Sequence, residues 1–244
     1  MTVSRYALVM AAGLLAASPA LAQSQNVSMS GIVVEYSGEV SGNGSFSGAT
    51  VDVSGSFGGD LEASGGAVEI NADVGEELEA SGGAVSLTGR VGGDAEISGG
   101  AVEINLQISG ESEISGGAVE ISPRTVLTGD AEISVGALEF AGQAISRLDI
   151  DFGDMEFSGI ADGIIDFDGN SREGLFRRRD RSEIEIRGVI NAGGEICAHD
   201  VRFTSGAEVN GPLTVYSDSP PAFPNGFDSG NVSYVERERP RCRD

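Results

Sequence analysis

Residues 64–71 read SGGAVEIN, and the same eight letters return at 98–105. SGGAVSLT stands between them at 81–88, SGGAVEIS follows at 115–122, and more divergent copies begin at Ser30, Ser47 and, two residues late, Ser134. The phrase therefore recurs with a 17-residue period. A fixed short period indicates one structural unit that is stacked many times, each copy burying its apolar face against the next.

The unit is a coil of β-structure. So short a period cannot hold a pair of helices, and the apolar residues alternate with polar ones, as in a strand with one buried face. Val68 and Ile70 should point inward and Glu69 outward, with glycine pairs such as Gly65-Gly66 at corners that require positive φ. The pattern predicts an all-β fold, a single-stranded β-solenoid of about ten coils.

Three boundaries divide the chain. Residues 1–22 carry Arg5, an apolar run and Ala20-Leu21-Ala22, the layout of a cleaved signal peptide, with an uncleaved membrane anchor as the alternative. The solenoid occupies 23–217, and the period breaks at 170–182, which we interpret as a loop expelled from the stack. Residues 218–244 have no period and form a tail or cap. We expect export to the periplasm, the extracellular space or the cell surface, with no transmembrane segment after cleavage.

Export places the two cysteines, Cys197 and Cys242, in an oxidising compartment. We expect them to form a disulfide that ties the tail to the last coils; two free thiols are the alternative.

The charge is strongly acidic and uneven. The chain has 38 acidic residues and 15 basic ones, giving a net charge of −23. Residues 30–168 contain 26 of the acidic residues against only Arg90, Arg124 and Arg147. Such a surface repels nucleic acid and anionic lipid and attracts cations or basic proteins.

The repeat stacks carboxylates into two columns. The first acidic ladder consists of Glu62, Glu79, Glu96, Glu113, Glu132, Asp149 and Asp166; the second consists of Glu69, Glu103, Glu120, Glu139 and Glu156, with Ser86 as a gap. Carboxylates ~4.8 Å apart repel one another, and calcium bound along the first ladder would relieve that repulsion. The alternative is a solvated acidic face, because no calcium-loop motif is present.

The expelled loop concentrates the opposite charge in Arg177, Arg178, Arg179 and Arg181. One hypothesis is that this loop docks on the acidic face of a neighbouring molecule, and the alternative is a solvated mobile loop.

No catalytic site is expected. His199, the only histidine, is predicted to be structural and to stack on Tyr216, which lies one repeat later. The sequence contains no phosphate-binding loop, zinc-ligand spacing or nucleophile elbow, so no enzymatic activity and no cofactor other than calcium are predicted.

The phrases FGGDLEASGGAVEI at 57–70 and VGGDAEISGGAVEI at 91–104 resemble the repeats of bactofilins, polymer-forming cytoskeletal proteins. This resemblance implies a right-handed, three-sided β-helix that self-associates end to end. The SGG phrases are also similar to those of putative adhesins of the head GIN domain type. We therefore expect an exported, non-catalytic scaffold. The alternative is a monomeric, adhesin-like module whose acidic faces bind cations, an envelope or extracellular glycan, or a basic protein.

Overall fold

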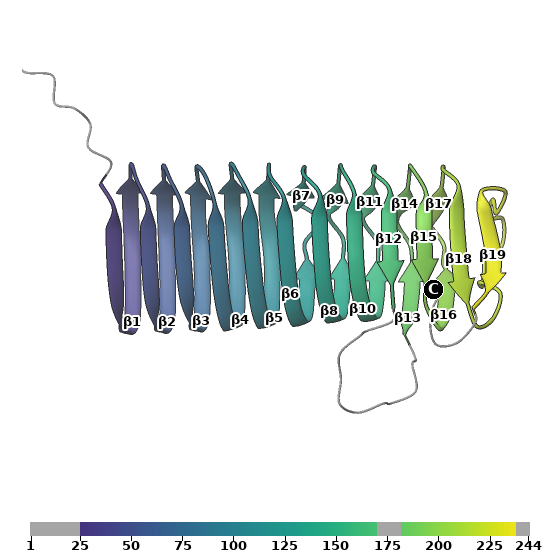
Figure 1. The fold of residues 1–244 in the computed structure, drawn as a ribbon, viewed down its shortest axis with the longest axis horizontal. Coiled ribbons are helices and arrows are strands. Elements are labelled where there is room, and N and C mark those ends of the chain that lie inside the picture. The colour runs from purple at the N-terminus through teal and green to yellow at the C-terminus, as the bar shows by residue number, and fades with distance from the viewer. Residues whose placement is uncertain (1–24, 170–181, 238–244) are drawn as a thin grey trace, which may run out of the picture.

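The computed structural model describes residues 25–169 and 182–237, and these residues form one continuous parallel β-solenoid of about 12 coils without any helix. Figure 1 shows the coils side by side in an elongated rod, with β1 at one end and β19 at the other. The predicted fold class is confirmed, with more coils than the ten expected. The predicted signal peptide (1–22) and the arginines of the predicted docking loop, Arg177, Arg178, Arg179 and Arg181, lie outside the described residues.

The first five coils are long bent strands, and later coils divide into shorter ones. The long strands are β1 (Val27–Val40), β2 (Gly44–Phe57), β3 (Leu61–Val74), β4 (Leu78–Val91) and β5 (Ala95–Ile108). They are followed by β6 (Ser112–Ile121), β7 (Val126–Leu127), β8 (Ala131–Phe140), β9 (Gln143–Ala144), β10 (Leu148–Phe157) and β11 (Ile160–Ala161). The last are β12 (Ile165–Asp168), β13 (Glu183–Ile186), β14 (Val189–Ile190), β15 (Gly194–Cys197), β16 (Asp200–Phe203), β17 (Glu208–Val209), β18 (Leu213–Ser217) and β19 (Val232–Glu236).

The predicted columns are confirmed by the strand register. Val68 pairs with Val85 and Ile70 with Leu87 in the next coil, and all four side chains are buried. The core is a stack of such columns that runs the length of the rod, and the polar residues between them face solvent. Parallel pairing with buried apolar columns explains how a chain so rich in carboxylates still has an apolar interior.

The 17-residue spacing holds over most of the stack, and a 19-residue spacing replaces it where a coil is enlarged. Ser112 pairs with Ala131, and the additional residues form a turn in which the Thr125 backbone N–H donates to the Ser122 carbonyl at 3.0 Å. A similar turn joins Ala207 to Thr204 at 3.1 Å. The second turn corrects the predicted stacking of His199 on Tyr216, since Tyr216 pairs with Cys197 instead.

The glycine pairs at the corners have a different cause from the one expected. Positive φ occurs at Gly55 and Gly89, among others, but not at Gly65 or Gly66. A Cβ on Gly66 would instead lie 2.8 Å from the carbonyl oxygen of Ala49 in the preceding coil. These glycines are required because successive coils approach too closely for a side chain, rather than by their backbone angles.

The tail contributes to the stack. β19 adds a parallel strand to β18, with Leu213 opposite Val232. Phe223 stacks on Phe203 at a centroid distance of 5.2 Å, and Phe227 packs against Phe203 with a tilted ring at 5.1 Å. The prediction of an aperiodic tail is therefore wrong for Val232–Glu236, because a 19-residue step concealed the strand from a search at the shorter period.

Candidate functional site

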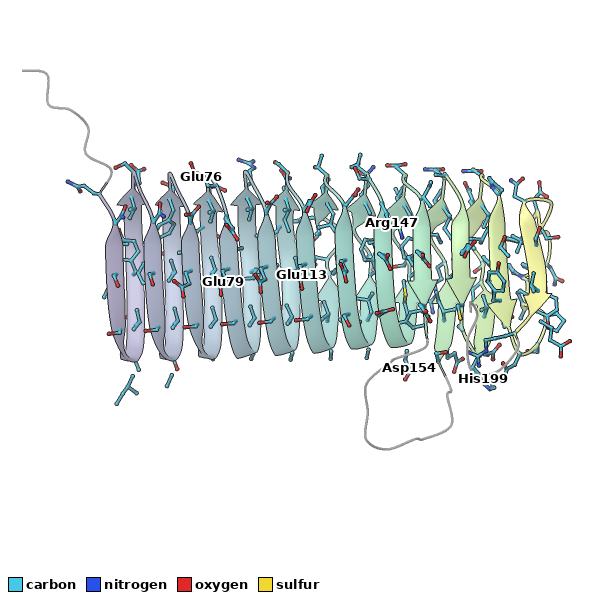
Figure 2. The ribbon with its side chains drawn as sticks, viewed as in Figure 1. Glu76, Glu79, Glu113, Arg147, Asp154 and His199 are labelled. Atoms are coloured by element: carbon cyan, nitrogen blue, oxygen red, sulfur yellow. The ribbon has the colours of Figure 1, made fainter. Side chains whose placement is uncertain are left out.

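The first acidic ladder forms as predicted along one face of the rod. Glu79, Glu96 and Glu113 occupy the same register position in successive strands, and Figure 2 shows Glu79 and Glu113 on the face towards the viewer. All members before Asp149 are exposed. Within the described residues no three acidic, histidine or cysteine side chains are arranged to hold a metal ion, so calcium binding stays a prediction without a formed site.

A second acidic column, which the sequence pattern had not revealed, lies two residues before the first ladder. Together with the first ladder, this column lines a groove of about 410 Å³. Its acidic members are Glu77, Asp94, Glu111 and Asp130, and Arg147 occupies the same position in the next coil. The aspartates have a structural role, because Asp94 Oδ1 accepts a hydrogen bond from the Glu111 backbone N–H at 2.8 Å. Asp130 does the same for Arg147 at 3.1 Å. The regular spacing of short Asn and Asp side chains was the available signal.

This hydrogen bond gives a stability prediction. Asp94→Ala leaves the Glu111 N–H without its acceptor and should lower the free energy of unfolding by about 1 kcal/mol. Asp94→Asn retains an acceptor oxygen and removes the same charge, so it should stay close to the parent. Chemical denaturation measures both variants, with Glu96→Ala, two residues further along the chain, as a surface control. Equal effects of Asp94→Ala and Glu96→Ala would contradict the capping role.

Arginine bridges successive rungs of the first ladder at one point. Arg147 Nη2 lies 2.9 Å from Asp149 Oδ2 and 3.4 Å from Asp166 Oδ2, which are register partners in neighbouring strands. The hydrogen bond to Asp149 raises the pKa of Arg147, partial desolvation opposes this shift, and the charges of Asp149 and Asp166 add to it. One guanidinium thus spans two rungs of the carboxylate ladder.

The second acidic ladder borders a groove of about 1020 Å³ that we call the second-ladder groove. It extends from Val33 in β1 to Glu185 in β13. One side is a column of small exposed residues, the floor is the buried valine column, and the other side is the ladder; examples from one coil are Ala101, Val102 and Glu103. The ladder is longer than predicted, since Glu156 pairs with Glu185 across the 170–181 insertion.

Only the C-terminal end of this groove carries ion pairs within the described part of the chain. Arg187 Nη1 lies 3.1 Å from Glu156 Oε1, and its Nη2 lies 2.7 Å from Glu185 Oε1. The hydrogen bond to Glu185 and the charges of Glu156 and Glu185 together raise the pKa of Arg187. This is the same two-rung bridge as that made by Arg147 on the other ladder.

His199 belongs to a cluster with Asp218 and Arg237 near the C-terminal end of the described residues. Its Nδ1 lies 2.8 Å from Asp218 Oδ2, and Asp218 Oδ1 accepts from Arg237 Nε at 2.9 Å. The Arg237 side chain is only 1% exposed. These contacts join the loop before β16, the end of β18 and the residue after β19. The structural role of His199 stays a prediction.

Cys197 lies on β15 and is disulfide-bonded. Cys242, its predicted partner and the only other cysteine of the chain, lies outside the described residues. The described residues also contain no helical segment with the length and apolarity needed to cross a bilayer.

The two ends of the rod differ. β1 pairs with β2 on one edge, and within the described residues no strand pairs with its other edge. Three large apolar side chains are exposed on this strand: Met29 at 38%, Ile32 at 81% and Val33 at 61%. At the opposite end β19, the last strand among the described residues, is five residues long, and the backbone N–H of Arg237, the residue after it, donates to the Ser217 carbonyl.

Fold and surfaces together define a non-globular, acidic repeat protein with a parallel β-solenoid structure. Comparisons with protein-family models, curated proteins and solved structures found no match.

Proposed function

We propose that the chain is an exported, non-catalytic structural rod that self-associates through its N-terminal end. The observation that carries this proposal is the edge of the 14-residue strand β1 on which no strand of the described residues pairs, with Ile32 and Val33 exposed on β1. A long unpaired strand with apolar side chains is a template for pairing with another chain. The resemblance of the repeats to bactofilins, which polymerise, adds support.

The difference between the ends specifies the kind of assembly. A filament requires two complementary ends. Here the N-terminal end has a 14-residue strand with exposed apolar side chains, whereas the C-terminal end has a five-residue strand beside a charged cluster. Two rods meeting by their N-terminal ends would instead bury the same surface on each partner, which gives a closed dimer. The proposed function is therefore that of a structural scaffold made of two rods joined at their N-terminal ends.

The test is the molar mass of the chain from Gln23 onward, measured by light scattering over a range of concentrations. We expect the mass to rise to twice that of one chain and then to stop. Ile32→Lys should weaken this association by about tenfold or more, because it places an unpaired charge in a buried contact. Ile164→Lys is the matched control, since Ile164 is 57% exposed but lies away from the end.

A constant mass equal to one chain would contradict the dimer and favour the alternative function. That alternative is a monomeric, adhesin-like binding module, and the observation in its favour is the acidic second-ladder groove. Its partner would be a cation, a glycan or a basic protein. A mass that increases without limit would also contradict the closed dimer and would indicate an open filament.

A further inference from the structure

We propose that the second-ladder groove binds guanidinium groups, and that its occupant is the arginine-rich segment of the same chain, residues 170–181. This docking is independent of the association proposed for the N-terminal end. Three features support it: the chemistry of the groove, the carboxylates that lack ion pairs within the described residues, and the positions where the segment leaves and rejoins the solenoid.

The described residues already contain the kind of ion pair that we propose for the groove, an arginine bound to two carboxylates in successive coils. Arg187 bridges Glu156 and Glu185, two consecutive rungs of the second ladder, at 3.1 and 2.7 Å. Arg147 makes the same bridge between Asp149 and Asp166 on the first ladder. The planar guanidinium has donors on several sides, so it can bind two carboxylates that are one coil apart. Rungs of this spacing therefore fit arginine.

Most rungs of the groove are still open to such a partner. Within the described residues Glu103, Glu120 and Glu139 make no ion pair, although they lie in consecutive coils at the same register position. Neighbouring like charges ~4.8 Å apart repel one another along the column. Beside them runs an exposed apolar surface formed by Ala101, Ala118 and similar residues. The groove thus favours a chain with cationic and apolar side chains.

The segment 170–181, NSREGLFRRRDR, has that composition. It contains five arginines and two acidic residues, together with Leu175 and Phe176. Five of the 15 basic residues of the chain are therefore concentrated in 12 positions. The arginines complement the ladder, and the two apolar side chains complement the alanine and valine surface.

The solenoid position at which this segment rejoins the stack lies at the groove. Asp151 pairs with Asp168 and Asp154 with Glu183, so the 12 added residues leave the solenoid between these two positions. Asp154 and Glu183 both line the groove. Figure 2 shows Asp154 at the lower edge of the rod, on the same side as His199.

The length of the segment is also sufficient. Half of it, fully extended, spans roughly 20 Å at about 3.4 Å per residue. This equals about four coils at ~4.8 Å each, the separation between β13 and β5, so the length is sufficient to reach Glu139, Glu120 and Glu103. Docking within one chain also avoids the entropic cost of bringing two molecules together. These reasons favour the segment of the same chain over that of a neighbour.

Limited trypsin digestion of the intact chain tests the proposal, because trypsin cleaves after arginine. Cleavage after Arg177, Arg178 and Arg179 is followed by mass spectrometry. Glu103→Gln, Glu120→Gln and Glu139→Gln together should accelerate this cleavage by at least about fivefold, because three ion pairs are lost. The matched control is Glu96→Gln, Glu113→Gln and Glu132→Gln, which removes the same charge from the same coils on the other ladder and should have little effect.

Two further measurements complete the test. The protection should weaken in 0.5 M salt, chosen because it shortens the screening length to about 4 Å. It should not depend on protein concentration. In a second variant, Arg177→Gln with Arg178→Gln and Arg179→Gln, amide exchange in residues 170–181 should accelerate to the same extent as in the groove variant.

Equal cleavage rates in the groove variant, the control variant and the parent would overturn the proposal. Protection that increases with protein concentration would also overturn it, since the occupant would then be the segment of a second copy. The N-terminal association is measured by molar mass and by Ile32→Lys, so either proposal can fail without the other.

Discussion

Gly100→Val is expected to disrupt the middle of the solenoid. A Cβ at this position would lie 2.8 Å from the carbonyl oxygen of Gly83, an atom that cannot move without displacing its whole coil. The same close approach recurs at Gly83 and Gly117. A shift of one coil that removed the clash would therefore press that coil against the next one. We expect a loss of about 3 kcal/mol or more in the free energy of unfolding, at the upper end of overpacking effects.

The control is Ala101→Val, the adjacent residue in the same strand. Its side chain is exposed on the edge of the groove, and valine is favoured in strands, so the change should lie within about 0.5 kcal/mol of the parent. Denaturant unfolding monitored by circular dichroism measures both variants. If Gly100→Val is no less stable than Ala101→Val, the coils can separate locally and the steric explanation of the SGG phrase is wrong.

The first coils show why this glycine is needed inside the stack. The column that contains Gly66 and Gly100 begins with Ile32 and Ala49. Ile32 lies in β1, where no described strand precedes it, and its side chain is 81% exposed. Side chains are thus accommodated in the first two coils, as Ile32 and the small Ala49, whereas glycine occupies this column from Gly66 to Gly153.

Phe157→Ala is the second change with a large expected effect. Phe157 is completely buried, stacks on Phe140 at a centroid distance of 5.3 Å and contacts Phe167 at 5.6 Å. Truncation leaves a cavity among rings in three consecutive coils, which should cost about 3–5 kcal/mol. The expected result is a shift of the denaturation midpoint, with accelerated amide exchange concentrated in β8, β10 and β12.

Phe223→Ala provides the comparison. Phe223 stacks on Phe227 at 5.0 Å, but it is 41% exposed and lies beside the last coils, so its loss should cost no more than about 2 kcal/mol. A larger effect at Phe223 than at Phe157 would mean that the C-terminal cap, and not the aromatic core, limits the stability of the rod.

The coil and its columns follow directly from the amino-acid sequence. The 17-residue period and the alternation of residues such as Val102, Glu103 and Ile104 fix which side chains point inward, because side chains alternate along a strand and parallel coils stack in register. Both acidic ladders follow from the same rule. Every one of these features depends on local geometry repeated at a constant spacing.

Features that break that spacing, or that depend on neighbouring coils, emerged only from the folded chain. Because of a 19-residue step, His199 lies beside Asp218 rather than Tyr216. A second 19-residue step places β19, which belongs to the predicted tail, beside β18. The glycine pairs are required because neighbouring coils approach closely, and this approach cannot be inferred from the sequence of a single coil. The bridge from Arg187 to Glu156 likewise depends on the 12-residue insertion, because only stacking brings residues 31 positions apart into one ion pair.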